Sequence, residues 1–163
     1  MVHRLRQLSI AGFKSIRDAT VEFHNINVLI GANGAGKSNL VSCFGFLHDI
    51  IAGRLGAYVA RHGGANALMH FGRKVSPQIT FKPDFSPNGY EAVLAPTTND
   101  ALFFAREACW FHAPGSASPL QKELGAGHTE SKLPSEEGIA GYVLDLMPRT
   151  WRPICIGFAS LVR

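Results

Sequence analysis

Eight consecutive residues in the first quarter of the chain have the types and spacing that bind a chain of phosphates. They satisfy the pattern G-x-x-x-x-G-K-[ST] at every fixed position. In that pattern the glycines let the backbone curl so that successive N–H groups point at an anion. The lysine ammonium reaches the β and γ phosphates, and the final hydroxyl binds Mg²⁺. The eight residues are Gly31, Ala32, Asn33, Gly34, Ala35, Gly36, Lys37 and Ser38. The sequence therefore predicts a phosphate-binding loop with Ser38 as a magnesium ligand.

The segments on either side of this loop favour that interpretation. Val28–Ile30 are apolar and predict a buried strand that enters the loop, and the chain from Ser38 onward predicts a helix. The positive N-terminal end of that helix faces the phosphates. Apolar residues at three-and-four spacing form one stripe that packs on a sheet, and Gly53 is a natural stop. These residues are Leu40, Cys43, Phe44, Leu47, Ile50 and Ile51. The alternative is a glycine-rich turn that binds nothing, and the flanking strand and helix argue against it.

Two further strands are predicted before the one that enters the loop. Leu5, Leu8 and Ile10 mark the first, and Thr20–Phe23 alternates apolar and polar residues as on a half-buried strand. The segment Gly12–Ile16 provides the turn between them. This order argues against two classes of protein. Small-molecule kinases generally open with the loop itself, and regulatory GTPases need a downstream N-K-x-D motif that the sequence lacks.

A β-rich block follows the first helix and a glycine-broken connection that includes one short helix. Alternating segments and turn residues predict three or four antiparallel strands, a β meander. The segments are Gln78–Phe81, Tyr90–Leu94, Ala101–Phe104 and Ala108–Phe111, with a hairpin turn at Ser86–Gly89. The aromatic residues of this block are either core and cross-strand pairs or a platform on which bases stack. They are Phe81, Phe85, Tyr90, Phe103, Phe104, Trp110 and Phe111.

The last third of the chain shows weaker patterns. The segment 114–137 is rich in Gly, Ser, Pro and charged residues, which predicts a flexible insertion of low order. A helix is predicted from about Ser135 to Pro148, followed by a short apolar tail. The predicted organisation is a lobe with the β meander over residues 1–113, the insertion over 114–137, and a C-terminal helix and tail over 138–163.

Composition predicts one globular core and no membrane segment. Of the 163 residues, 46 % are hydrophobic and 17 % are charged. No apolar run approaches the length of a membrane span, and Arg4 and Arg6 interrupt the segment where a signal peptide needs its apolar core. The three cysteines are widely spaced, which supports neither a disulfide framework nor a metal site. We therefore expect a cytoplasmic protein with buried thiols and no membrane partner.

The charge balance leaves contact with DNA open. The formal net charge is +4, which suits a nucleic-acid partner but is also common in proteins that bind none. A basic cluster in the connection after the first helix is either a patch for phosphate or DNA, or a scatter of solvated charges. Its members are Arg54, Arg61, Arg73 and Lys74.

Residues 5–51 resemble the opening of RecF/SMC-like ATPases, the ABC-type ATPases of DNA repair and phage defence that are also labelled AAA-family predicted ATPases. The likeness rests on Leu8–Phe23, with its Gly12-Phe13-Lys14-Ser15 turn, and on Asn27–Asn39. It implies an α/β fold, the N-terminal lobe of a P-loop NTPase. It also implies ATP and Mg²⁺ as cofactors, bound by Gly31–Ser38 and Asn39, with a contact to the nucleotide edge from Lys14 and Ser15.

The same resemblance implies a head that dimerises and traps two nucleotides between the loop of one subunit and a signature segment of the other. Hydrolysis in such enzymes needs an L-S-G-G-type signature and a Walker B strand that ends in Asp-Glu. Leu124–Gly127 has the glycines of a signature but no serine, and Tyr142–Asp145 is followed by Leu146 instead of a glutamate. We interpret both as coincidences and expect an incomplete head, with no catalytic residue of its own, that pairs with a second copy or with a complementing C-terminal half.

Three functions follow from these observations. The first is an ATP-binding module with little or no turnover alone. The second is a P-loop phosphotransferase that uses Asp145 or a loop carboxylate as its base. The third is a DNA- or partner-binding protein whose loop is vestigial.

Overall fold

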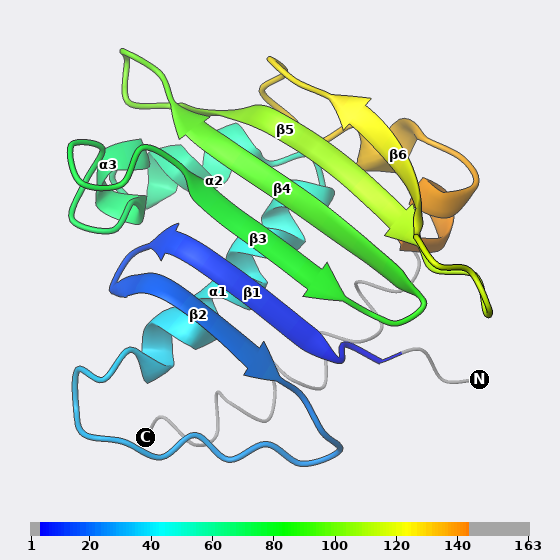
Figure 1. Ribbon diagram of the computed structural model, residues 1–163. Helices are drawn as coiled ribbons and strands as arrows, with labels where there is room; N and C mark the ends of the chain where they lie inside the picture. Colours follow the sequence, from blue (N-terminus) through cyan, green and yellow to red (C-terminus); the bar gives the residue numbers. More distant parts are fainter. Residues whose placement is uncertain (1–3, 144–163) are drawn as a thin grey trace.

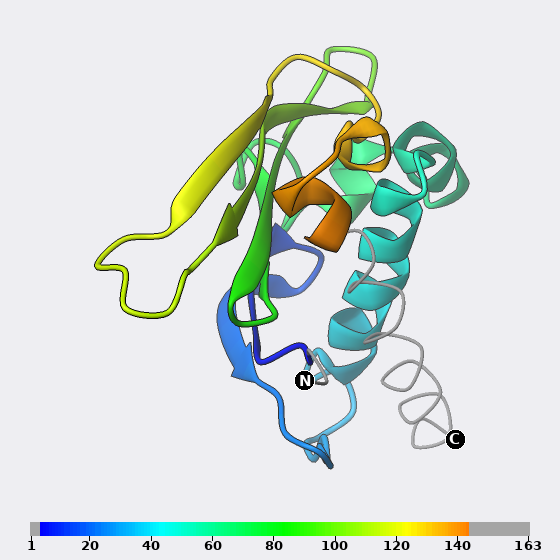
Figure 2. The same cartoon turned by 90° about the vertical axis from the view of Figure 1, so that its right-hand side faces the viewer.

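A six-stranded antiparallel sheet with helices on one face forms the fold (Figures 1 and 2). The computed structural model describes residues 4–143. The strands lie in the order β2-β1-β3-β4-β5-β6. They are β1 (Gln7–Phe13), β2 (Ile16–Glu22), β3 (Ile79–Asp84), β4 (Asn88–Pro96), β5 (Leu102–Phe111) and β6 (Leu120–Gly125). The helices are α1 (Lys37–Ile51), α2 (Leu55–Arg61), α3 (Ala65–Leu68) and the 3-10 helix η1 (Leu133–Ser135). The chain is therefore a mixed α/β protein.

β1 and β2 form the hairpin that the sequence predicts. Leu8 pairs with Val21 and Phe13 with Ile16, which leaves Lys14 and Ser15 as the two-residue turn. β1 also pairs with β3 in antiparallel register, although more than 60 residues separate Ile10 from its partner Phe81. Because this long-range pairing places β1 inside the sheet, both edges of the hairpin's first strand are hydrogen-bonded.

The predicted β meander is confirmed, with one difference in detail. β3, β4, β5 and β6 pair consecutively in antiparallel register. The two segments expected at Ala101–Phe104 and Ala108–Phe111 form one continuous strand, β5, which has a bulge at Ala105 opposite Val93 and Leu94 of β4. A bulge lets a long strand keep pairing while its partner shifts register.

The core lies between the sheet and α1. The predicted apolar stripe of α1 is buried, and Phe46 joins it with no exposed surface. The rings of Phe13, Phe46 and Phe81 pack against one another, with centroids 5.3 to 5.5 Å apart. Aromatic pairs at such distances add to the stability gained from burial of their area. Phe81 and Phe104 are fully buried, so these two aromatic residues are core residues and not part of a platform for bases.

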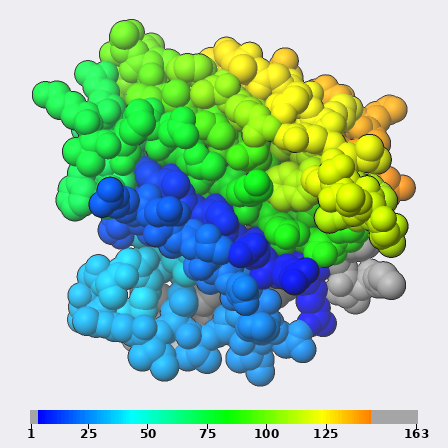
Figure 3. All heavy atoms as spheres, viewed as in Figure 1, coloured from blue at the N-terminus to red at the C-terminus, as the bar shows by residue number. Residues whose placement is uncertain are grey.

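The face of the sheet opposite α1 is left open by the described helices (Figure 3). Because side chains alternate along a strand, Lys82, Gly89 and Trp110 lie on this open face. The Trp110 ring lies over Gly89, where a Cβ would come within 1.9 Å of the indole. The Lys82 ammonium lies 5.1 Å from the ring centroid of Trp110. Gly89 thus provides the space that the indole occupies.

Two sequence predictions about strands are wrong. Val28–Ile30 are not a buried strand: Val28 is 62 % exposed and Ile30 is 90 % exposed, and no ladder includes them. The segment 114–137 is not a structureless insertion, because β6 pairs with β5 there and η1 follows. The predicted C-terminal helix begins at Ile139. Its expected end at Pro148, together with Asp145, Leu146 and the tail, lies outside the described residues.

A buried carboxylate fixes the chain that follows β6, which we call the β6 loop (residues 126–135). Glu107 has no exposed surface and accepts hydrogen bonds from the Tyr90 hydroxyl at 2.6 Å and from His128 Nε2 at 2.8 Å. The Ser131 hydroxyl and the backbone N–H of Lys132 also donate to it. Four donors compensate for the removal of this charge from water.

A second acidic side chain ties the same loop to the helical layer. The Glu130 carboxylate accepts hydrogen bonds from the first N–H groups of α2, those of Leu55 at 2.7 Å and Gly56 at 2.9 Å. A carboxylate at a helix N-terminus satisfies unpaired donors and complements the helix dipole. The β6 loop therefore joins the last strand to α2. Within the described residues, none of the helices is both long and apolar enough for a membrane span.

Candidate nucleotide-binding site

The predicted phosphate-binding loop leads directly into α1. Gly34 and Gly36 have φ angles of 86° and 91°, a region that residues with a Cβ adopt at a cost. The N–H of Ala35 donates to the Ala32 carbonyl at 3.1 Å, which closes a turn inside the loop. α1 begins at Lys37, so the two glycines allow the backbone to reverse just before the helix.

The N-terminus of α1 has the features of an anion site. No side chain caps the helix, and its first turn contains no acidic residue. The first N–H groups of a helix lack partners inside the helix and carry a partial positive charge. An anion of the charge and size of a phosphate group complements this end without displacing a capping side chain.

Lys37 closes over the loop from the first position of the helix. Its ammonium donates hydrogen bonds to the carbonyl oxygens of Gly31 at 2.5 Å and Ala32 at 2.8 Å. The side chain therefore lies across the loop and not in solvent. These two carbonyls hold the cation beside the N-terminus of α1, where it adds to the positive field of the helix.

The Lys14–Ser15 turn lies against the first turns of α1, although the two segments are more than 20 residues apart in sequence. Asn39 Nδ2 donates to Ser15 Oγ at 2.7 Å, and Lys14 Nζ donates to Ser42 Oγ at 3.2 Å. A Cβ on Gly36 would lie 3.2 Å from the same Ser15 oxygen. The structure thus brings Lys14, Ser15 and Asn39 together with the loop. The roles of these residues in nucleotide binding remain predictions.

The segment after α3 holds this turn in place, which sequence reasoning missed. The Lys14 N–H donates to the Leu68 carbonyl at 2.8 Å, and the His70 N–H donates to the Gly12 carbonyl at 2.9 Å. His70 Nδ1 donates to the Lys14 carbonyl at 2.8 Å. A contact across 56 residues leaves no signal in local periodicity. Gly72, which follows His70 and Phe71, is the local feature of the sequence that indicates an unusual backbone here.

Several other candidates lie away from this site. Leu124 is buried in β6, so Leu124–Gly127 does not lie on a signature helix. Arg54 and Arg61 both form ion pairs with Asp49, at 2.5 and 2.8 Å. These two arginines therefore do not form a free basic patch with Arg73 and Lys74.

The described cysteines are buried thiols, as predicted. Burial raises the pKa of Cys43 well above its ordinary value, and it raises that of Cys109 to about 11. Both thiols therefore stay protonated and unreactive near neutral pH. Cys155 lies outside the described residues. Among those residues, no group of three or more His, Cys, Asp or Glu side chains is placed to hold a metal ion.

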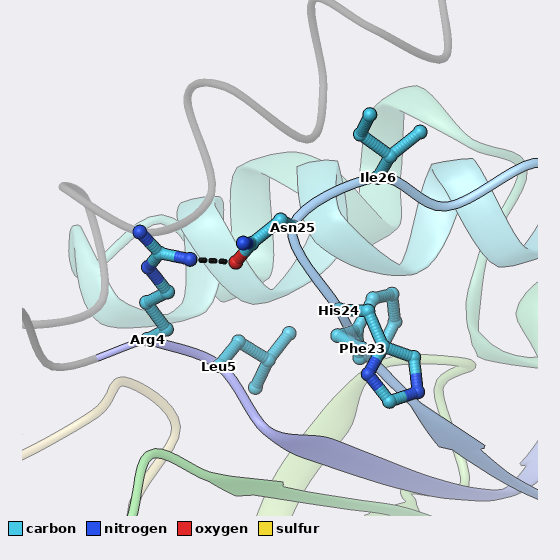
Figure 4. Close-up of a pocket in the computed structure, with 6 residues that line it drawn as sticks. All are labelled: Arg4, Leu5, Phe23, His24, Asn25 and Ile26. Carbon is cyan, nitrogen blue, oxygen red and sulfur yellow. Dashed lines mark hydrogen bonds between the residues drawn. The ribbon is translucent and has the colours of Figure 1, made fainter.

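A shallow pocket of about 440 Å³ lies at the opposite end of the hairpin from the Lys14–Ser15 turn (Figure 4). Leu5 and Phe23 give it an apolar wall, and Arg4 donates a hydrogen bond to Asn25 Oδ1 at its rim. His24 and Ile26 complete the lining. The pocket is therefore distinct from the phosphate-binding loop.

The glycine loop, the uncapped helix and the supporting turn together have the geometry of an anion site, and comparison with known proteins finds similarity over the same segment. Residues 4–50 match the family described as the AAA ATPase domain. The chain is also 37 % identical over 68 residues to the DNA replication and repair protein RecF of Renibacterium salmoninarum. The alignment covers 40 % of this chain and 17 % of that protein. The N-terminal segment of the chain is therefore similar to the N-terminal part of RecF-like AAA ATPases.

Proposed function

We propose that this chain is an ATP-binding module in which Gly31–Ser38 and Asn39 bind the phosphates of Mg·ATP, within a P-loop NTPase fold. The observation that supports this most is the N-terminus of α1, which has no side-chain cap and has the Lys37 ammonium beside it. The match of residues 4–50 to the AAA ATPase domain agrees with this assignment.

Each residue of the site has a distinct part in this proposal. The N–H groups at the start of α1 donate to the phosphates, and Lys37 exchanges the carbonyls of Gly31 and Ala32 for phosphate oxygens. The Ser38 hydroxyl is the protein's ligand to Mg²⁺, which neutralises phosphate charge when bound. Ser15 and Asn39 hold the hairpin turn against the loop, and Lys14 adds a second cation at 3.2 Å from Ser42.

We extend the proposal to partners: the chain associates with a second subunit and with DNA. The RecF match supports the DNA part of this proposal, because that relative's name refers to DNA replication and repair. Neither match refers to phage defence. The formal charge of +4 is compatible with a nucleic-acid partner.

Thermal unfolding with and without Mg·ATP tests the core of the proposal. At a nucleotide concentration one hundred times the dissociation constant, binding stabilises the folded state by about 2.7 kcal/mol, which raises the melting temperature by roughly 5–11 °C. Lys37→Ala is expected to abolish the shift because it removes the ammonium that contacts the phosphates.

Lys132→Ala is the matched control, since Lys132 is an exposed lysine in the β6 loop. This variant should keep the full nucleotide-induced shift. Wild-type protein that melts at the same temperature with and without Mg·ATP would contradict the proposal.

A further inference from the structure

The loop after α3 presents an aromatic side chain in a conformation that the fold itself does not require. Phe71 is 79 % exposed, and its φ angle is 51°, in the left-handed region that bulky residues rarely adopt. Exposure of a large apolar ring and an unfavourable backbone are two separate costs at one residue. Such a combination points to a contact that the unliganded chain does not make.

Hydrogen bonds on both sides make the position of Phe71 well defined. His70 is bonded through its N–H and its ring to the β1–β2 hairpin, at Gly12 and Lys14. On the other side, Gly72 accepts hydrogen bonds from the N–H groups of Val75 and Ser76, at 3.1 and 3.0 Å. The Phe71 ring packs edge-on against the His70 ring, with centroids 4.4 Å apart. The ring is therefore held at the surface by a rigid loop.

A series of contacts connects Phe71 to the predicted nucleotide site. The segment after α3 runs beside the tip of the β1–β2 hairpin (Figure 1). Lys14, which is bonded to His70, precedes Ser15, and Ser15 Oγ accepts a hydrogen bond from Asn39 and lies 3.2 Å from where a Cβ on Gly36 would be. A continuous set of contacts thus leads from Phe71 to the loop that faces the phosphates.

We propose that Phe71 stacks on the base of the nucleotide whose phosphates occupy the Gly31–Ser38 loop. This inference rests on the proposed function. A nucleotide bound by its phosphates at the N-terminus of α1 extends its base away from the helix. An exposed aromatic ring beside the hairpin turn then offers a π-face to that base. Stacking tolerates any base, because every base has such a face.

Calorimetric titrations with two ligands separate the base contact from the phosphate contact. Mg·ATP carries both groups, whereas Mg·tripolyphosphate carries only the phosphates. Phe71→Ala is expected to weaken ATP binding about tenfold, within the range that alanine substitution of base-stacking aromatics gives. Its affinity for tripolyphosphate should stay that of the wild type. Phe71→Tyr keeps the ring and should keep ATP affinity, and Phe71→Leu should behave as alanine.

Val75→Ala is the matched control, because Val75 is an apolar side chain of the same loop with 61 % exposure. It should bind both ligands as the wild type does. Unchanged ATP affinity in Phe71→Ala, or an equal loss for both ligands, would overturn the stacking proposal. If the wild type binds neither ligand, the proposed function itself is wrong, so the two failures are distinguishable.

Discussion

At the scale of single residues, Glu107 shows how a buried charge organises its surroundings. Its two oxygens receive donors from β4 and from the β6 loop, namely Tyr90, His128, Ser131 and the N–H of Lys132. The proximity of Glu107 adds to burial in raising the pKa of Tyr90 well above its ordinary value. The phenol therefore remains a hydrogen-bond donor throughout the physiological pH range.

Removal of this carboxylate should be among the most destabilising single changes in the chain. Glu107→Ala leaves the Tyr90 hydroxyl and the His128 ring without their acceptor, so we expect a loss of about 3–5 kcal/mol in the free energy of unfolding. Urea denaturation measures it. Glu22→Ala, on the exposed face of β2, is the control and should change stability by less than about 0.5 kcal/mol. Equal midpoints for the two variants would show that the Glu107 hydrogen bonds add nothing to stability.

At the scale of elements, the Gly12 end of β1 connects the sheet to the predicted nucleotide site. Gly12 has a φ of 70°, and a Cβ there would lie 2.2 Å from the Gln78 carbonyl oxygen. Its own carbonyl accepts the His70 N–H, so it lies between β3 and the segment that holds the hairpin turn. Space and backbone conformation both require glycine at this point.

Gly12→Ala should therefore lower both stability and nucleotide affinity. The backbone must move to relieve the clash, and we expect a loss of about 3 kcal/mol in the free energy of unfolding, above the roughly 1 kcal/mol that left-handed backbone alone costs alanine. Gly115→Ala separates the cost of the steric clash from the cost of the left-handed backbone, because Gly115 has a similar φ of 79° and open space around it. Urea midpoints measure the first effect and the shift induced by Mg·ATP the second. A Gly12→Ala variant no less stable than Gly115→Ala would rule out the steric explanation.

The sequence predicts those elements whose pattern comes from a single buried face. The stripe of α1 and the alternation in β1, β2 and β4 are of this kind, because their periods follow directly from burial on one side. The sequence does not predict β6, because many of its residues are polar, as expected of an edge strand. Leu124 is its one side chain classed as buried. Its pairing with β5 is a tertiary contact that local composition does not encode.

In the candidate site, too, local sequence patterns reveal some residues, whereas others come together only through tertiary contacts. The sequence alone singles out Gly31–Ser38, because phosphate binding by backbone N–H groups restricts residue types within one short segment; the binding role of the loop stays a prediction. The association of Lys14 and Ser15 with that segment came from family resemblance, and the structure brings them together. The part played by Leu68 and His70 depends on contacts across more than 50 residues, which no local pattern shows. The prediction of a buried strand at Val28–Ile30 failed because an apolar run does not specify whether a neighbouring strand covers it.

At the scale of the whole molecule, the buried thiols couple stability to alkaline pH. Burial raises the pKa of Cys109 from 9.0 to about 11, and it raises that of Cys43 further. Between those values the folded state keeps protons that the unfolded state has lost, so the free energy of unfolding must fall as pH rises. The stabilising effect is fully present below about pH 9 and is lost progressively above it.

Urea denaturation between pH 8 and pH 11 should therefore show a steady decline in stability. The double variant Cys43→Ala, Cys109→Ala should start lower, because it leaves small cavities, but should decline less steeply. Lys74→Ala, on an exposed loop, serves as a control and should follow the wild-type slope. An identical slope in the cysteine variant would assign the alkaline decline to other groups.

The indole of Trp110 gives the sheet its own optical reporter. It lies over Gly89 and beside the Lys82 ammonium, on the face opposite α1 and the phosphate-binding loop. The chain has two tryptophans, so a Trp151→Phe background leaves a single tryptophan in this fixed environment. Its emission then follows the integrity of β3, β4 and β5 independently of events at the far side of the sheet. Global unfolding and ligand occupancy can in this way be read as separate signals from the same sample.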